Sequence, residues 1–111
     1  MNSHQSSIDT TEIQAEIRRH KSTLYKIFRE TERQKKRLAS GDEHIQLLMA
    51  DLPADDDTKE KRLIEIEMVE ASLYDTVVEI GRLESEREKG DEMLTQFSNM
   101  LANSTQPAPK E

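Results

Sequence analysis

The sequence predicts an all-α protein built as a long antiparallel helical hairpin of the coiled-coil type. Apolar residues recur at seven-residue spacing along two long stretches, which is the pattern of helices that pack along one seam. A single short connector containing a proline separates the two stretches. Only 33% of the residues are hydrophobic while 35% are charged, so narrow apolar stripes suit this composition better than a globular core.

The first predicted helix covers residues 11–52 and follows a polar stretch, residues 1–10, that we expect to form a flexible tail. Its seven-residue row is Ile17, Leu24, Thr31, Leu38, Ile45 and Leu52. The companion heptad positions are apolar at Ile13, Ile27 and Leu48 and are interrupted by His20, Gln34 and Gly41. Pro53 disfavours helical backbone in the residue before it, so we expect the helix to end at Leu52.

The second predicted helix covers residues 58–101, after a turn at residues 53–57. Asp57 is the expected N-cap, with Glu60 three residues later as in a capping box. The seven-residue row of this helix is Ile66, Leu73, Ile80, Arg87, Leu94 and Leu101. The row is flanked by Leu63, Val69, Val77, Leu83 and Phe97. Because the turn is so short, we expect the second helix to run antiparallel to the first. Residues 102–111 are expected to form a flexible C-terminal tail.

The residues that we expect to close the hairpin seam are Ile17, Leu24, Leu38, Ile45, Ile66, Leu73 and Ile80. Gly41 and Gly90 are candidate helix breaks, because each precedes an Asp–Glu pair that could cap a new helix. Leu38 and Ile45 keep one heptad phase across Gly41, which favours a continuous first helix. In a continuous helix, Gly41→Ala should stabilise the fold by about 1 kcal/mol. Residues 84–92 contain no apolar side chain, so no heptad phase can be followed in the same way across Gly90.

The two predicted helices are related by a faint internal repeat. A shift of 49 residues aligns residues 12–52 with 61–101, and ten of the 41 aligned pairs are identical. They include Leu24/Leu73, Tyr25/Tyr74 and Gly41/Gly90. Because 49 residues are seven heptads, the matches on the apolar rows follow from periodicity alone. A duplicated helical unit and a composition shared by any two coiled-coil helices both remain open.

The sequence offers no set of residues suited to catalysis or to binding a metal or cofactor. His4, His20 and His44 lack the three- or four-residue spacing that places two ligands on one helix face. The chain has no cysteine, no glycine-rich phosphate loop and no nucleophile motif. We therefore expect neither an enzyme nor a cofactor or metal site.

Residues Arg18–Arg37 form a basic stretch, in which nine Lys or Arg stand against two Glu, a local charge of +7 in a chain of −7. Five acids of the second helix could neutralise this stretch from the antiparallel segment: Asp75, Glu79, Glu84, Glu86 and Glu88. We favour such cross-helix pairing over a nucleic-acid or acidic-membrane site, because a negative net charge repels phosphates at long range.

The second helix has more apolar residues than one seam can cover. Twelve of the 21 residues from Leu63 to Leu83 are Leu, Ile, Val, Met, Ala or Tyr. We expect the surplus to bind partner helices through Ile64, Met68, Ala71, Tyr74 and Val78. The partner is then a protein, in a homodimer or hetero-oligomer that completes a four-helix bundle.

The predicted function is a non-enzymatic protein–protein interaction module, a small coiled-coil subunit or adaptor of a larger assembly. Two alternatives remain open: a small helical chaperone for a secreted or assembling helical client, and a nucleic-acid or acidic-membrane binder that uses Arg18–Arg37. We favour a protein partner over a nucleic acid. No apolar run approaches the roughly 20 residues of a transmembrane segment and no signal-peptide pattern is present, which predicts a cytoplasmic or nuclear protein.

Overall fold

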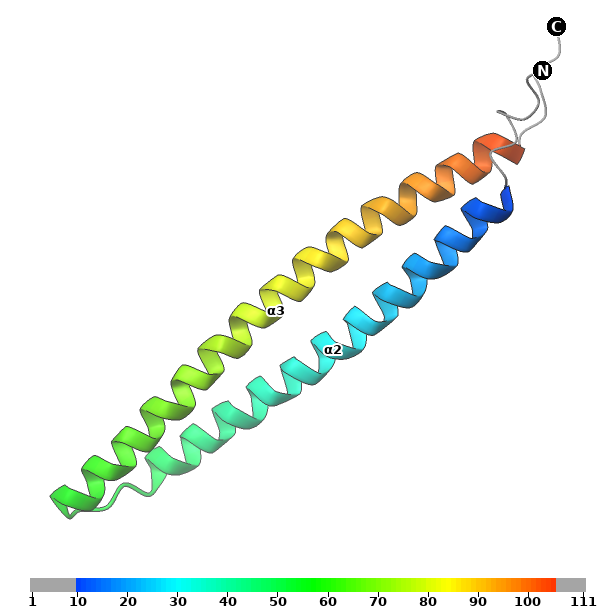
Figure 1. Cartoon of the computed structure of the whole chain (residues 1–111). Helices are drawn as coiled ribbons and strands as arrows, with labels where there is room; N and C mark the ends of the chain where they lie inside the picture. Colours follow the sequence, from blue (N-terminus) through cyan, green and yellow to red (C-terminus); the bar gives the residue numbers. More distant parts are fainter. Residues whose placement is uncertain (1–9, 106–111) are drawn as a thin grey trace, which may run out of the picture. The chain divides into compact units, whose positions relative to one another are not determined.

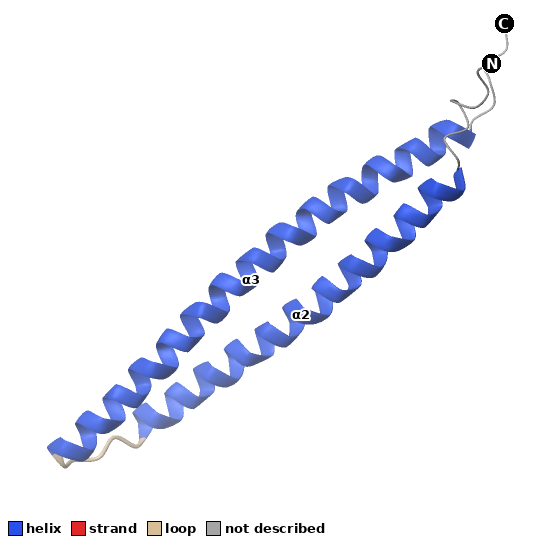
Figure 2. Cartoon of the chain, viewed as in Figure 1, coloured by secondary structure: helices blue, strands red, loops and turns tan. Residues whose placement is uncertain are grey.

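The computed structural model describes residues 10–105 and contains two helices, α2 (Thr10–Ala50) and α3 (Asp56–Thr105), joined by residues 51–55 (Figure 1). No strand occurs between residues 10 and 105, and the connector is the loop coloured tan in Figure 2. The chain is an all-α antiparallel helical hairpin, so the predicted fold class is confirmed.

The helix ends differ from the predicted ones by a few residues. α2 ends at Ala50 rather than Leu52, because the chain already turns at Asp51 ahead of Pro53. α3 begins at Asp56 and continues to Thr105, so residues 102–105, expected in the C-terminal tail, are helical. The rest of both predicted tails, residues 1–9 and 106–111, lies outside the described residues.

The start of α3 is set by Asp55 and not, as expected, by Asp57. Oδ2 of Asp55 accepts hydrogen bonds from the backbone N–H of Thr58 (3.0 Å) and from the Thr58 hydroxyl (2.8 Å). The N–H of Lys59 donates to the carbonyl of Asp55 at 2.8 Å, so the helical hydrogen bonds begin there. Asp57 lies in the first turn, where its charge faces the positive end of the helix dipole.

Both helices continue through the glycines that were candidate breaks, and neither glycine has a positive φ. Each glycine lies against a leucine of the other helix. A Cβ added to Gly41 would lie 3.0 Å from Cγ of Leu73 and nearer still to Cδ2 of that side chain. A Cβ added to Gly90 would lie 2.6 Å from Cδ2 of Leu24. The glycines therefore make room for leucines, and they neither end nor begin a helix.

The described residues form two compact units, the first containing residues 10–28 and 85–105 and the second containing residues 29–84. In the first unit the blue start of α2 lies beside the orange end of α3 (Figure 1). Its half-buried seam residues are Ile17, Leu24, Ile27, Leu94, Phe97 and Leu101, and Ile13 is buried. The ring of His20 stacks on Phe97 with centroids 5.3 Å apart. The His20 ring thus occupies a seam position by packing its flat face against Phe97.

The second unit contains the hairpin turn and most of the buried side chains. The buried residues are Thr31, Ile66, Leu73, Thr76 and Leu83. The half-buried apolar residues of the seam are Leu38, Ile45, Leu48, Val69 and Ile80. With Ile17 and Leu24 of the first unit, all seven residues expected to close the seam are buried or half-buried.

Two residues that we expected beside the seven-residue row of α3 lie outside the seam. Leu63 and Val77 are 41% and 50% exposed, whereas the adjacent Arg62 and Thr76 are half-buried and buried. Alternating spacings of three and four residues from Ile66 lead to positions 62 and 76, not 63 and 77. Helix geometry therefore places a charged and a polar residue inside in preference to the apolar neighbours.

The polar seam residues have partners for their polar atoms. Arg62 donates from Nη1 to the carbonyl of Asp51 at 3.1 Å, which satisfies a carbonyl just beyond the end of α2. The hydroxyl of Thr76 donates to the carbonyl of Ser72 at 3.1 Å, one turn earlier in α3. Arg87, a member of the predicted row in the first unit, is exposed.

Candidate interaction surface

An open groove of about 440 Å³ runs along one edge of the seam in the second unit. It is lined by Leu38, Asp42, Ile45, Glu70, Leu73, Tyr74 and Val77. The seam residues form its floor, Tyr74 and Val77 extend its apolar wall along α3, and the two carboxylates are its only charged groups. Outside the groove, Nε2 of His44 lies 4.0 Å from Oε1 of Glu65. The two helices are therefore bridged by a polar pair at one place and leave apolar surface open at another.

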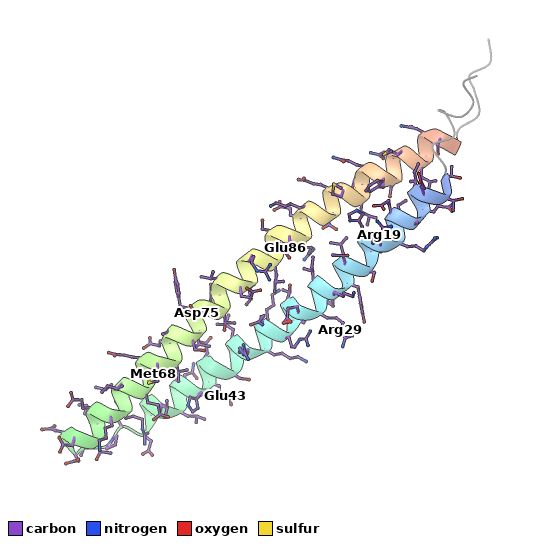
Figure 3. The ribbon with its side chains drawn as sticks, in the orientation of Figure 1. Arg19, Arg29, Glu43, Met68, Asp75 and Glu86 are labelled. Carbon is purple, nitrogen blue, oxygen red and sulfur yellow. The ribbon has the colours of Figure 1, made fainter. Side chains whose placement is uncertain are left out.

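The outer side of α3 carries a continuous set of exposed apolar side chains, here called the apolar face of α3. It consists of Leu63, Ile64, Met68, Ala71, Tyr74, Val77 and Val78. Met68 and Tyr74 are 69% and 70% exposed, and Figure 3 labels Met68 on this part of α3. The exposed fractions correspond to roughly 600 Å² of side-chain surface, at the upper end for the largest apolar patch of an ordinary monomer. Such a patch is typical of an interaction site.

All five residues that the sequence predicted to bind a partner belong to this face: Ile64, Met68, Ala71, Tyr74 and Val78. Their role in binding stays a prediction. Sequence reasoning missed Leu63 and Val77, which it placed beside the seven-residue row of the second helix. Alternating three- and four-residue spacing, applied strictly from Ile66, would have placed both on the surface.

The charged neighbours of the apolar face are mainly acidic. Glu60, Glu67, Glu70 and Asp75 are exposed around it. Glu79, one helical turn from Asp75, accepts hydrogen bonds from Nε of Arg82 at 3.1 Å. This hydrogen bond holds the pKa of Glu79 below its usual value. A partner with basic residues beside its own apolar side chains fits this border.

Most of the basic stretch Arg18–Arg37 is not neutralised by the pairing expected from the sequence. Arg19 and Arg33 pair with Glu16 and Glu30, which lie on their own helix, and the second of these contacts measures 3.4 Å. Arg19 and Arg29 are labelled on α2 in Figure 3. Six bases form no ion pair with any residue from 10 to 105: Arg18, Lys21, Lys26, Lys35, Lys36 and Arg37. For these six the expected cross-helix pairing is wrong, and their charge stays exposed to solvent.

Within residues 10–105, no three His, Cys, Asp or Glu side chains come together as a group that could hold a metal ion. Neither α2 nor α3 has a stretch long and apolar enough to cross a bilayer. Comparison with known proteins gives no match to a family model, to a curated protein or to a solved structure.

Proposed function

We propose that this protein is a non-enzymatic protein–protein interaction module, a small coiled-coil subunit that binds helices through the apolar face of α3. One observation carries the proposal. In the second unit the seam is already filled, with Leu73 only 8% exposed, yet Met68 and Tyr74 on the same helix remain about seven-tenths exposed. Surface of this kind costs about 25 cal/mol per Å² to leave in water, and a partner that covers it recovers that free energy.

A helix is the partner that best fits this face. The apolar residues follow one another at three- and four-residue spacing along about four turns of α3, so that a second helix can pack lengthwise against them. A compact partner domain would touch only part of such a strip. Two partner helices beside this hairpin complete a four-helix bundle, in which the apolar face becomes core.

Introducing a charge at the face tests the proposal. Met68→Asp and Val78→Asp should each abolish association measured by sedimentation equilibrium, because an unpaired carboxylate in a packed interface carries a large desolvation cost. Circular dichroism should show that the helices remain. Leu73→Asp should instead unfold the chain, because it places the charge in the closed seam against Gly41.

Ser40→Asp is the matched control, since Ser40 is exposed on α2, away from the apolar face, and the added charge is the same. It should leave association unchanged. If Val78→Asp and Met68→Asp behave like Ser40→Asp, with the same mass in solution and the same bound proteins, the apolar face is not a binding surface and the proposal is wrong.

A second candidate function is binding of a nucleic acid or an acidic membrane through Arg18–Arg37. The six bases without an ion-pair partner among residues 10–105 favour it. The net charge of −7 opposes it, because the remaining acids repel a polyanion beyond the range of the local contacts. We therefore rank nucleic-acid or membrane binding below helix binding as the proposed function.

A further inference from the structure

Two stripes of side chains on the two helices have the same spacing and opposite charge. The α2 stripe, in the first unit, is Arg18, Lys21, Tyr25 and Phe28. The α3 stripe, in the second unit, is Glu67, Glu70, Tyr74 and Val77. In both, the successive residues are three, four and three positions apart, so each stripe follows one face of its helix.

All eight side chains are exposed. Tyr25 and Phe28 are 60% and 52% exposed, and Tyr74 and Val77 are 70% and 50% exposed. The four charged members form no ion pair with any residue from 10 to 105: Arg18, Lys21, Glu67 and Glu70. Each stripe thus combines an exposed apolar half with an exposed charged half.

The stripes correspond residue by residue under the 49-residue shift that relates the two helices. Arg18 corresponds to Glu67 and Lys21 to Glu70, while an aromatic or apolar side chain occupies the other two positions of both stripes. The same shift relates Lys35 to Glu84, again a base to an acid. Within the two stripes, the shift therefore keeps the spacing and reverses the charge.

We propose that the partner of the apolar face is a second copy of this chain, and that the α2 stripe of each copy packs on the α3 stripe of the other. This inference rests on the proposed function and names its partner. With the two helices running in the same direction, Arg18 lies opposite Glu67 of the second copy and Lys21 opposite Glu70. Tyr25 and Phe28 then cover the apolar members of the stripe, beside the groove.

Direction follows from the order of residues in the stripes. Running the helices in opposite directions, with the stripes aligned, would place Arg18 against Val77 and Lys21 against Tyr74. That arrangement pairs no charges and covers the apolar wall of the groove with bases. Two copies offer the same-direction pairing twice, with the roles of the helices exchanged, so the contact is self-complementary as a twofold dimer requires.

The apolar part of the contact is formed by aromatic side chains of α2 and the apolar half of the α3 stripe. Tyr25 and Phe28 add aromatic surface on the order of 250 Å². In the proposed contact they meet Tyr74 and Val77, the two members of the apolar face that belong to the α3 stripe. The groove along Tyr74 and Val77, about 440 Å³, offers space beside this contact for the aromatic side chains of the other copy.

A pair of charge-reversal variants tests the inference. Variant X carries Arg18→Glu with Lys21→Glu, which makes both stripes acidic, and variant Y carries Glu67→Lys with Glu70→Lys, which makes both basic. For each variant alone, sedimentation equilibrium at low salt should give a dimer dissociation constant at least about tenfold higher than that of wild type, because like charges then meet in both contacts. Mixed one to one, X and Y should form a heterodimer within about threefold of wild-type affinity, since opposite charges meet again.

Lys26→Glu with Lys36→Glu is the matched control, because it changes the net charge as much as variant X does at two exposed positions outside the stripes. It should dimerise like wild type. A single chain with Lys21→Glu and Glu70→Lys should also dimerise like wild type, because the pair is exchanged rather than broken. Circular dichroism of every variant shows whether its helices are intact.

The outcomes separate the inference from the proposed function. If wild type remains a monomer, or if X and Y alone associate as wild type does, the stripes do not hold two copies together and the inference is wrong. The proposed function survives either result when Val78→Asp still abolishes binding of a protein partner. If neither Val78→Asp nor the charge reversals change any association, both are wrong.

Discussion

At the residue scale, one carboxylate determines where α3 begins. The first residues of a helix have N–H groups without helical partners, and Oδ2 of Asp55 accepts the N–H of Thr58. The hydroxyl of Thr58 donates to the same oxygen. These hydrogen bonds hold the pKa of Asp55 below its usual value of 3.8, and the one from the Thr58 N–H has a larger effect than the one from the hydroxyl. Asp57 makes no such bond, although its position before Glu60 fits the sequence pattern of a cap.

Asp55→Ala should therefore destabilise the hairpin more than Asp57→Ala does. Loss of an N-cap should lower Tm by about 4 °C, because one helical N–H loses its acceptor. Asp57→Ala removes only a charge near the helix dipole and should lower Tm by roughly 1–2 °C. Thermal unfolding followed by circular dichroism, at one protein concentration, measures both. Equal effects would mean that Asp55 is not the cap in solution.

The stability conferred by the Asp55 charge should depend on pH in a stated direction. Because the folded-state pKa lies below the unfolded value, the contribution is fully present above the unfolded pKa and is lost as pH falls through the folded one. Asp55→Asn keeps the capping oxygen and removes the titration. The Tm advantage of wild type over Asp55→Asn should thus be constant above about pH 5 and shrink below about pH 4.

At the element scale, the two helices approach each other by fitting a leucine of one against a glycine of the other. The pair is Leu73 with Gly41 in the second unit, and Leu24 with Gly90 in the first. The 49-residue shift exchanges these two pairs, so both units use one packing device with the roles of the helices reversed. The glycines that were candidate helix breaks in the sequence are places where a leucine of the other helix packs closely against the helix backbone.

Gly41→Ala should consequently destabilise the chain, opposite to the stabilisation expected from helix propensity alone. A Cβ at Gly41 would overlap the buried side chain of Leu73, and overpacking costs about 1–3 kcal/mol against a propensity gain of about 1 kcal/mol. Gly81→Ala is the control, because a Cβ there meets nothing within 4 Å, and it should stabilise by about 1 kcal/mol. Denaturant unfolding measures both, and stabilisation by both substitutions would contradict the close approach at Gly41.

The sequence predicted the seven-residue rows of both helices, because an apolar repeat of seven residues sustained over many turns is typical of helices packed along one seam. It also placed six residues beside those rows that are buried or half-buried, and it missed Arg62 and Thr76. The six are Ile13, Ile27, Leu48, Val69, Leu83 and Phe97. Between residues 62 and 77, apolar side chains surround α3, so that choosing by apolarity selected Leu63 and Val77 where helix geometry selects Arg62 and Thr76. Sequence reasoning could not predict the groove for another reason: its lining combines residues of both helices, and their placement side by side depends on how the helices pack.

At the scale of the whole molecule, charge is distributed unevenly between the two helices. The basic residues concentrate in Arg18–Arg37, and acids surround the apolar face of α3. Sequence reasoning paired these charges within one chain because the helices are antiparallel. For six of the bases that pairing is absent among residues 10–105, and all six side chains are exposed. Their charge is then available to another molecule.

An exposed basic helix fits a polyanion as well as an acidic protein surface, so binding of the basic stretch to nucleic acid has to be tested directly. We expect wild type to bind a 20-base-pair DNA duplex no more tightly than about 10⁻⁴ M at physiological salt, since the net charge of −7 repels phosphates. Fluorescence anisotropy with labelled duplex measures the affinity. The control combines Lys35→Ala, Lys36→Ala and Arg37→Ala, which removes three of the exposed bases and should change nothing if DNA is not the ligand. Sub-micromolar binding that falls steeply with salt and is lost in this variant would instead assign the basic stretch to nucleic acid. The basic stretch and the apolar face of α3 would then serve different partners.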